Sequence, residues 1–286
     1  MVSVAQFEEK TYEKYFGHEL AKIAGPTFSP GQVAEGYLGF DEAFFLPSYA
    51  HLDGMSLQEI DVLADAYSDL LPDWRFNLFV QYKRPEYVRG HRAAEWSSWG
   101  QPYYRYQLVT HQQDALANVA AAAGTRAEVI YAAPAFWRSK TLFEAAGNHS
   151  VVSLSNVALA TSMQGHSRYS YIAPGKTGVA HSDPENVEAP SIEEILRRGA
   201  DQEPRPFRAH LEDLARSINA AAGKRKTIQN RLDDARRAIL SSAGLPIEVS
   251  QDRAAFSLAT VIAFRDTFGT AVYLFAASRL RSSPPR

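Results

Sequence analysis

Cysteine is absent from the 286 residues of the chain. A chain without cysteine has no disulfide framework and no zinc or iron–sulfur site held by thiolates. The first residues, MVSVAQFEEKTYEKYFG, also lack the basic start and apolar run of a secretion signal. We therefore expect a cytoplasmic protein.

Glycine-rich nucleotide-binding patterns are also missing. Neither G-x-x-x-x-G-K-[ST] nor G-x-G-x-x-G occurs, so neither an NTPase nor a dinucleotide-dependent enzyme is expected. The GKT triplet at 175–177 has no glycine at the required upstream spacing. The G-x-S-x-G pattern of serine hydrolases is absent as well.

Long uninterrupted hydrophobic runs are lacking too. The most apolar stretch, residues 254–278, approaches the length of a membrane span. Arg265 and Asp266 lie in its middle, however, where charge is costly in lipid. We predict a buried or partner-packed helix there and no membrane association.

The chain has no overall excess of positive charge, since its formal net charge is −2. This excludes a simple polycation that coats nucleic acid. The charge is uneven, because residues 1–74 contain 13 acidic and 3 basic residues and the remainder is net positive. A local basic groove is compatible with that distribution.

The spacing of apolar residues predicts alternating helices and strands. Helices are predicted over 6–24, 30–36, 56–71 and 103–123, and strands over 38–46, 76–83 and 127–137. This order predicts an α/β fold with a mixed or parallel sheet.

Beyond these elements the sequence changes character. Residues 138–206 are rich in Ser, His, Gly and Pro, which predicts loops, short strands and a small helix at SIEEILRRGA. From residue 207 onward the pattern is mainly helical. We therefore predict a core at 1–140, a loop-rich extension at 141–206, and a helical region at 207–286. The last region would form a homo-oligomer or bind a protein partner.

The stretch FNLFVQYKRPEY, residues 76–87, ends an apolar strand with polar residues. Residues two apart on a strand point to the same face, so Gln81 and Lys83 project together. Enzymes that cut phosphodiesters need oxygen ligands for a hard divalent cation and a group that orients or deprotonates water. Asp41, in GFDEAF on a neighbouring strand, would complete such a site.

With GFD at 39–41 and QYK at 81–83, the chain resembles the PD-(D/E)XK nuclease superfamily. The Q-x-K form is similar to its Mrr-like branch. The resemblance covers about residues 6–137 and implies a restriction-endonuclease-like mixed sheet flanked by helices. It implies that Asp41, Gln81 and Glu35 hold Mg²⁺ or Mn²⁺, with Glu19 as the alternative to Glu35. Lys83 would position or activate the attacking water.

The same resemblance implies a metal-dependent nuclease that acts on DNA, with a role in defence against foreign DNA. It also implies a glutamine on the following helix that faces the site. Gln107 and His111, four residues apart on the predicted helix, are candidates, as is Gln112.

Three features depart from the pattern of the family. About forty residues separate Asp41 from Gln81, no proline precedes Asp41, and a glutamine replaces a carboxylate. Because the loss of a negative ligand lowers the affinity for the cation, a catalytically inactive nuclease fold is the alternative. Such a protein would bind DNA or a protein partner without cutting.

Basic and aromatic residues alternate after Lys83. Cations suit phosphates, and aromatic faces suit bases. The predicted nucleic-acid contacts are Arg84, Arg89, Arg92, Arg105, Trp96 and Trp99.

A transition-metal site is a further alternative, since histidines and carboxylates gather in the irregular middle of the chain. These residues are His149, His166, His181, Asp183 and Glu185. No pair among them has the spacing of H-E-x-x-H, and HSDPE reads equally well as a turn.

Overall fold

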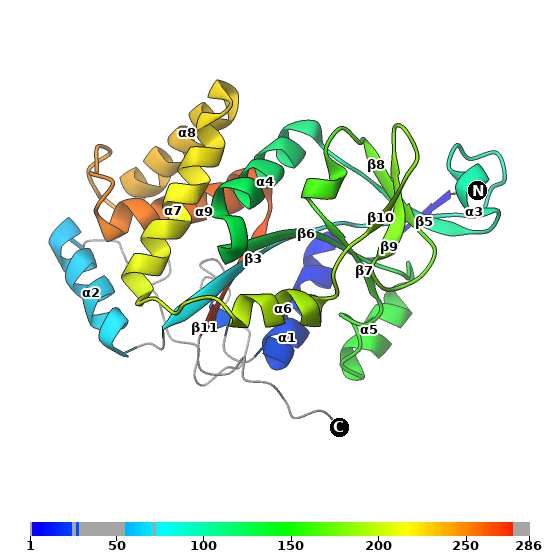
Figure 1. Ribbon diagram of the computed structural model, residues 1–286, viewed down its shortest axis with the longest axis horizontal. Helices are drawn as coiled ribbons and strands as arrows, with labels where there is room; N and C mark the ends of the chain where they lie inside the picture. The colour runs from blue at the N-terminus through cyan, green and yellow to red at the C-terminus, as the bar shows by residue number, and fades with distance from the viewer. Residues whose placement is uncertain (1, 25–26, 29–54, 71–72, 277–286) are drawn as a thin grey trace. The chain divides into compact units, whose positions relative to one another are not determined.

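The computed structural model of the chain describes residues 2–24, 27–28, 55–70 and 73–276 (Figure 1). It divides into two compact units, each assembled from three segments of the chain. Unit 1 contains residues 1–23, 80–117 and 129–195, and unit 2 contains residues 24–79, 118–128 and 196–286. Each unit therefore depends on contacts between residues far apart in the sequence.

Unit 1 contains a six-stranded sheet in which every neighbouring pair is antiparallel. Its strands, in spatial order, are β1 (Val2–Val4), β4 (Glu86–Val88), β5 (Tyr103–Gln107), β8 (Arg168–Tyr171), β9 (Thr177–His181) and β10 (Glu185–Glu188). Tyrosines dominate the buried positions of β5 and β8. This fits the preference of aromatic side chains for a pleated, half-buried surface.

A second sheet is mixed and has five strands. In spatial order they are β2 (Thr27–Phe28), β11 (Ala271–Ala276), β3 (Trp74–Tyr82), β6 (Ala127–Pro134) and β7 (Ser155–Leu159). Buried residues occupy nearly every position of β3 and β6. Their near-continuous apolar sequences are typical of strands that are covered on both faces.

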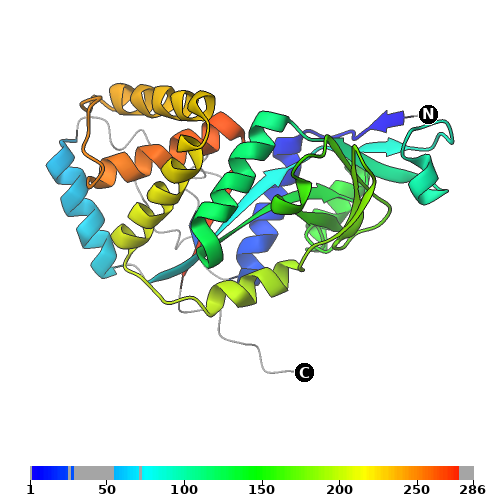
Figure 2. The same ribbon diagram turned by 45° about the horizontal axis from the view of Figure 1, so that its top comes forward.

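Nine α-helices accompany these sheets in the described part of the chain. They are α1 (Glu9–Ala24), α2 (Leu57–Leu70), α3 (Trp96–Trp99), α4 (Thr110–Ala123), α5 (Ser139–Gly147), α6 (Ile192–Ala200), α7 (Phe207–Gly223), α8 (Lys226–Ser242) and α9 (Ala254–Phe268). Capping boxes begin two of them: at α2, the Ser56 hydroxyl accepts from the Glu59 amide, and the Glu59 carboxylate accepts from the Ser56 amide. In unit 2, α7, α8 and α9 pack against one another (Figure 2).

Two predicted helices are wrong at one end. Residues 103–107 form β5, because YYRYQ is rich in tyrosine, which favours strands, and α4 begins only at Thr110. The predicted helix at 254–278 ends at Phe268, where Gly269 adopts the left-handed conformation with φ 62° and the chain continues as β11. Glycine takes this conformation without a Cβ clash, so it stops the helix.

The predicted α/β fold with a mainly helical C-terminal region is confirmed. The helix predicted over 30–36 and the strand predicted over 38–46 lie outside the described residues. None of the described helices is long and apolar enough to cross a membrane. Helix α9 is buried instead, at every position from 254 to 264.

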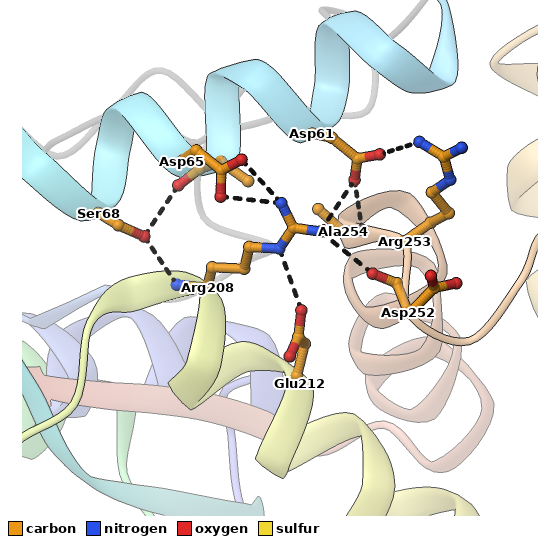
Figure 3. A network of polar contacts seen from close by, with 9 residues as sticks. Asp61, Asp65, Ser68, Arg208, Glu212, Asp252, Arg253 and Ala254 are labelled. Carbon is orange, nitrogen blue, oxygen red and sulfur yellow. Dashed lines mark hydrogen bonds and ion pairs between the residues drawn. The ribbon is translucent and has the colours of Figure 1, made fainter.

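Charged residues join three helices of unit 2 (Figure 3). Arg208 on α7 donates from one nitrogen, Nη1, to both carboxylate oxygens of Asp65 on α2, at 2.8 and 2.9 Å, and from Nε to Glu212 at 3.1 Å. Asp61, one turn before Asp65, accepts hydrogen bonds from the Arg253 side chain and, at 2.9 Å, from the amide of Ala254. Asp61 thereby caps the first turn of α9, where a carboxylate is favoured.

We predict that Asp61→Ala lowers the free energy of unfolding by about 2–3 kcal/mol, because it removes a buried cap and leaves Arg253 without its carboxylate. The side chain of Asp61 is only 11% exposed. Urea denaturation monitored by circular dichroism measures the change.

The matched control is Asp65→Ala on the same face of α2. Its side chain is 61% exposed, so its ion pair with Arg208 contributes at most about 1 kcal/mol. Equal losses for the two variants would contradict the capping role of Asp61.

Candidate active site

The C-terminal end of β3 carries the two polar residues that the sequence singles out. The strand is fully buried at Leu78, Phe79 and Val80 and ends at Tyr82. Gln81 is only 2% exposed, although its amide is polar. Lys83 follows directly, and its backbone amide donates to the carbonyl of Ala132 at 3.0 Å. Buried polar groups need partners, and these partners come from other elements of unit 1.

Gln112, in the first turn of α4, joins the two residues. Its Nε2 donates to Oε1 of Gln81 at 2.8 Å, and its Oε1 accepts from Nζ of Lys83 at 3.0 Å. Gln81 in turn donates from Nε2 to the carbonyl of Tyr82 at 3.3 Å. One amide thus holds both polar residues of the strand end in a fixed mutual position.

Tyr131 on β6 forms a wall beside the lysine. Nζ of Lys83 lies 5.6 Å from the centroid of the Tyr131 ring, within the range of a cation–π contact. The Tyr131 hydroxyl donates to Oε1 of Gln113, and Gln113 donates from Nε2 to the carbonyl of Ala160. Two adjacent glutamines of α4 therefore hold this wall of the site: Gln112 bonds to Lys83, and Gln113 bonds to Tyr131.

The charge of Lys83 is destabilised by its surroundings. Burial lowers the pKa of the Lys83 ammonium, and the carboxylate of Glu9 opposes this shift. Burial also raises the pKa of Glu9, while Lys83 and the amide of Arg84 lower it. Glu9 lies in the first turn of α1, and one of its oxygens accepts from the Arg84 amide at 3.2 Å. The site therefore pairs a partly desolvated ammonium with a partly desolvated carboxylate.

Glu9 is absent from the residues predicted from sequence. A signal for it was present: Glu9 precedes the buried Tyr12 by three residues and Phe16 by seven. That spacing puts Glu9 on the buried face of α1.

The other predicted catalytic residues have different outcomes. Asp41 and Glu35 lie outside the described residues. Glu19 is buried, and its Oε2 accepts from the amides of Val151 and Val152 at 2.6 and 3.2 Å. Its carboxylate therefore holds a turn of the backbone at Val151 and Val152.

The two candidates around α4 do not share a helical face. Gln107 is exposed at the end of β5, and His111 is exposed in the first turn of α4. Gln112 is the residue of this segment that contacts Gln81 and Lys83.

Three of the residues predicted to contact nucleic acid make hydrogen bonds or ion pairs with other residues of unit 1. Arg84 pairs with Glu8 at 3.2 Å and donates to the carbonyl of Ala5. Arg105 pairs with Glu86 and with the buried Glu95 at 2.7 and 2.9 Å. The indole of Trp99 donates to Ser170 at 2.9 Å.

The other three are placed nearer the solvent. Arg92 is exposed and Trp96 is half-buried, while Arg89 is exposed and packs on aromatic rings.

Among the histidines and carboxylates of the middle segment, one pair is in contact. His166 pairs with Glu185 at 3.4 Å, whereas His181 contacts Ser170 at 2.7 Å and His149 contacts Lys22. In the described part of the chain, no three residues of the types His, Cys, Asp and Glu are placed to hold one metal ion. The transition-metal alternative therefore gains no support.

No protein-family model, curated protein or solved structure matches the chain. The assignment of a function thus depends on the residues themselves and on the resemblance of their pattern.

We predict that Glu9→Gln lowers the pKa of Lys83 further, because it removes the negative charge that favours the ammonium. Dimethylation of the lysines with ¹³C-formaldehyde and NMR titration measure that pKa, and Lys83→Arg assigns the resonance. The matched control is Glu13→Gln, one turn along α1, where the carboxylate pairs with Lys10 at 2.8 Å. A Lys83 pKa that is unchanged by Glu9→Gln would contradict the pairing.

Proposed function

We propose that this protein is a metal-dependent nuclease that hydrolyses phosphodiester bonds of DNA. The observation that carries the proposal is the hydrogen-bonded chain Gln81–Gln112–Lys83 at the end of β3, in which Gln81 is buried and Gln112 and Lys83 are half-buried. A protein that needs only a stable strand end gains little from a lysine whose charge is desolvated there. Perturbed, mutually oriented polar groups of this kind are typical of catalytic sites.

Lys83 would act on the attacking water. Because burial lowers the pKa of Lys83, the neutral amine forms more readily than that of an exposed lysine. A neutral amine accepts a proton, whereas an ammonium does not. Gln112 holds the nitrogen in place through its oxygen, and Glu9 moderates the loss of the charge. In the ammonium form the same nitrogen would stabilise the negative charge that develops on the phosphate.

The donor chemistry fits a hard divalent cation. The amide oxygen of Gln81 is a neutral, hard donor of the kind that Mg²⁺ and Ca²⁺ accept in proteins. With Asp41 and Glu35 it would form an all-oxygen set, which suits Mg²⁺ or Mn²⁺ better than zinc. When bound, the cation would polarise the scissile phosphate as a Lewis acid.

The biological setting is proposed on the sequence resemblance alone. Defence against foreign DNA is the role that the resemblance implies, and the C-terminal helices remain the proposed surface for oligomerisation or a protein partner.

The test is cleavage of supercoiled plasmid by the purified protein with Mg²⁺, with Mn²⁺ and with EDTA. We expect metal-dependent nicking that Lys83→Ala and Asp41→Ala each reduce by about 10²–10⁴-fold. Lys140→Ala, an exposed lysine on α5, is the control and should leave the rate unchanged. A wild-type protein that binds the plasmid but never cuts it would identify an inactive nuclease fold instead.

We predict that Gln112→Ala slows cleavage by about 10–100-fold, the usual effect of removing a residue that orients a catalytic group. His111→Ala, the exposed neighbour on the same helix, should have no effect. Equal rates for the two variants would show that the bridge to Lys83 plays no part in the reaction.

A further inference from the structure

A column of aromatic rings crosses the six-stranded sheet of unit 1. Tyr87 on β4 is the register partner of Tyr104 on β5, and Tyr104 is the partner of Tyr171 on β8. Their ring centroids are 5.0 and 5.5 Å apart. Trp137, which follows β6, stacks on Tyr87 at 5.9 Å with an interplanar angle of 10°. We call Tyr171, Tyr104, Tyr87 and Trp137 the aromatic column.

The column runs from the interior to the surface. Tyr171 is fully buried, and its hydroxyl donates to the carbonyl of Pro134 at 2.8 Å. Tyr104, Tyr87 and Trp137 are half-buried. The inner rings therefore hold the outer rings in a fixed orientation, and the outer rings keep part of their surface in contact with solvent.

Two arginines lie at the outer end of the column. The guanidinium of Arg138 lies 5.1 Å from the centroid of Trp137, and that of Arg89 lies 5.8 Å from Tyr87 and 6.0 Å from Trp137. Both residues are exposed. Arg138 makes no ion pair with any described residue at the site, so its charge is available to an anion. An arginine that packs on a ring keeps its donors directed by that contact and suits phosphate oxygens.

The column lies close to the candidate active site along the chain. Tyr87 follows Lys83 by four residues, which places their Cα atoms within about 14 Å of each other. A ligand that contacts both would be an extended anion with planar groups.

We propose that the outer end of the aromatic column, formed by Tyr87, Trp137, Arg89 and Arg138, binds unpaired bases and phosphates of a single-stranded segment of DNA. The proposal rests on the proposed nuclease function and defines its substrate as DNA with a single-stranded region beside the cut. Flat aromatic faces favour unpaired bases, because the faces of paired bases are covered by their neighbours in the duplex. The two guanidiniums would hold the flanking phosphates.

The test measures binding in EDTA, where no cleavage is needed. Fluorescence anisotropy compares a labelled single strand, the same strand as a blunt duplex, and a duplex with a single-stranded tail. We expect the full-length protein to bind the tailed and single strands more tightly than the blunt duplex. Trp137→Ala should weaken single-strand binding by about 5–150-fold, and Trp137→Phe should restore most of it.

Two further variants separate stacking from charge and from general effects. Arg138→Gln should reduce the slope of log K against log salt concentration by about 0.7, the value for one phosphate of a single strand. Phe143→Ala on α5, an aromatic side chain that is 56% exposed in the same unit, is the matched control and should leave binding unchanged. Circular dichroism verifies that each variant is folded.

A spectroscopic signal tests the contact itself. Stacking of a base on Trp137 should quench its fluorescence in the wild type, and Trp137→Phe should reduce the quenching, with the other three tryptophans still present. Binding that is equal for the blunt duplex and the single strand, or that Trp137→Ala leaves intact, would overturn the proposal. Plasmid cleavage with Mg²⁺ is a separate readout. If the wild-type protein does not cleave the plasmid but binds the single strand in a Trp137-dependent manner, the nuclease proposal fails and the binding site stands.

Discussion

The amide of Gln112 is the contact on which the candidate site depends. A buried amide or ammonium without a partner costs about 1–3 kcal/mol or more, and β3 ends in one of each. A single glutamine on α4 satisfies both, because its donor faces Gln81 and its acceptor faces Lys83. An apolar residue at this position would remove one hydrogen bond from each of them. The two hydrogen bonds of Gln112 therefore help polar side chains to occupy the end of a strand that is otherwise apolar and buried.

The segment from Gln81 to Val88 contributes to both the candidate active site and the aromatic column of unit 1. Its first part ends β3 and carries the amide and the lysine, and its second part forms β4, from which Tyr87 enters the aromatic column. A DNA strand bound as proposed on the column would therefore lie near Lys83, the group proposed to act on water. Binding surface and reactive group are fixed by one short length of backbone, so that movement of one relative to the other is restricted. Such fixed geometry is what positional catalysis requires.

The sequence predicts parts of this arrangement and not others, for physical reasons. The shared direction of Gln81 and Lys83 follows from the two-residue period of a strand, so it was predictable from FNLFVQYK. The choice of Gln112 over Gln107 and His111 depends on where α4 begins, and the prediction extended this helix through the tyrosine-rich strand β5 that precedes it. Glu9 lies on the buried face of α1, as its spacing to Tyr12 and Phe16 indicates, but its approach to Lys83 depends on tertiary packing. The aromatic column depends on the register between β4, β5 and β8, which is set by tertiary pairing and not by local sequence.

The division of the chain into interleaved segments has a consequence for biosynthesis. Every described residue of the candidate site lies before residue 161, whereas β2 pairs with β11, Thr27 with Phe275. At about 5–20 residues per second, roughly 12–50 s of translation separate these two strands. During that interval the apolar residues of β3 that belong to unit 2, such as Trp74, Phe76 and Phe79, have been synthesised before the partner elements that cover them. Trp74, Phe76 and Phe79 therefore lack these covering residues for much of the time that the chain takes to be translated, and surface of this kind makes incomplete chains prone to aggregation.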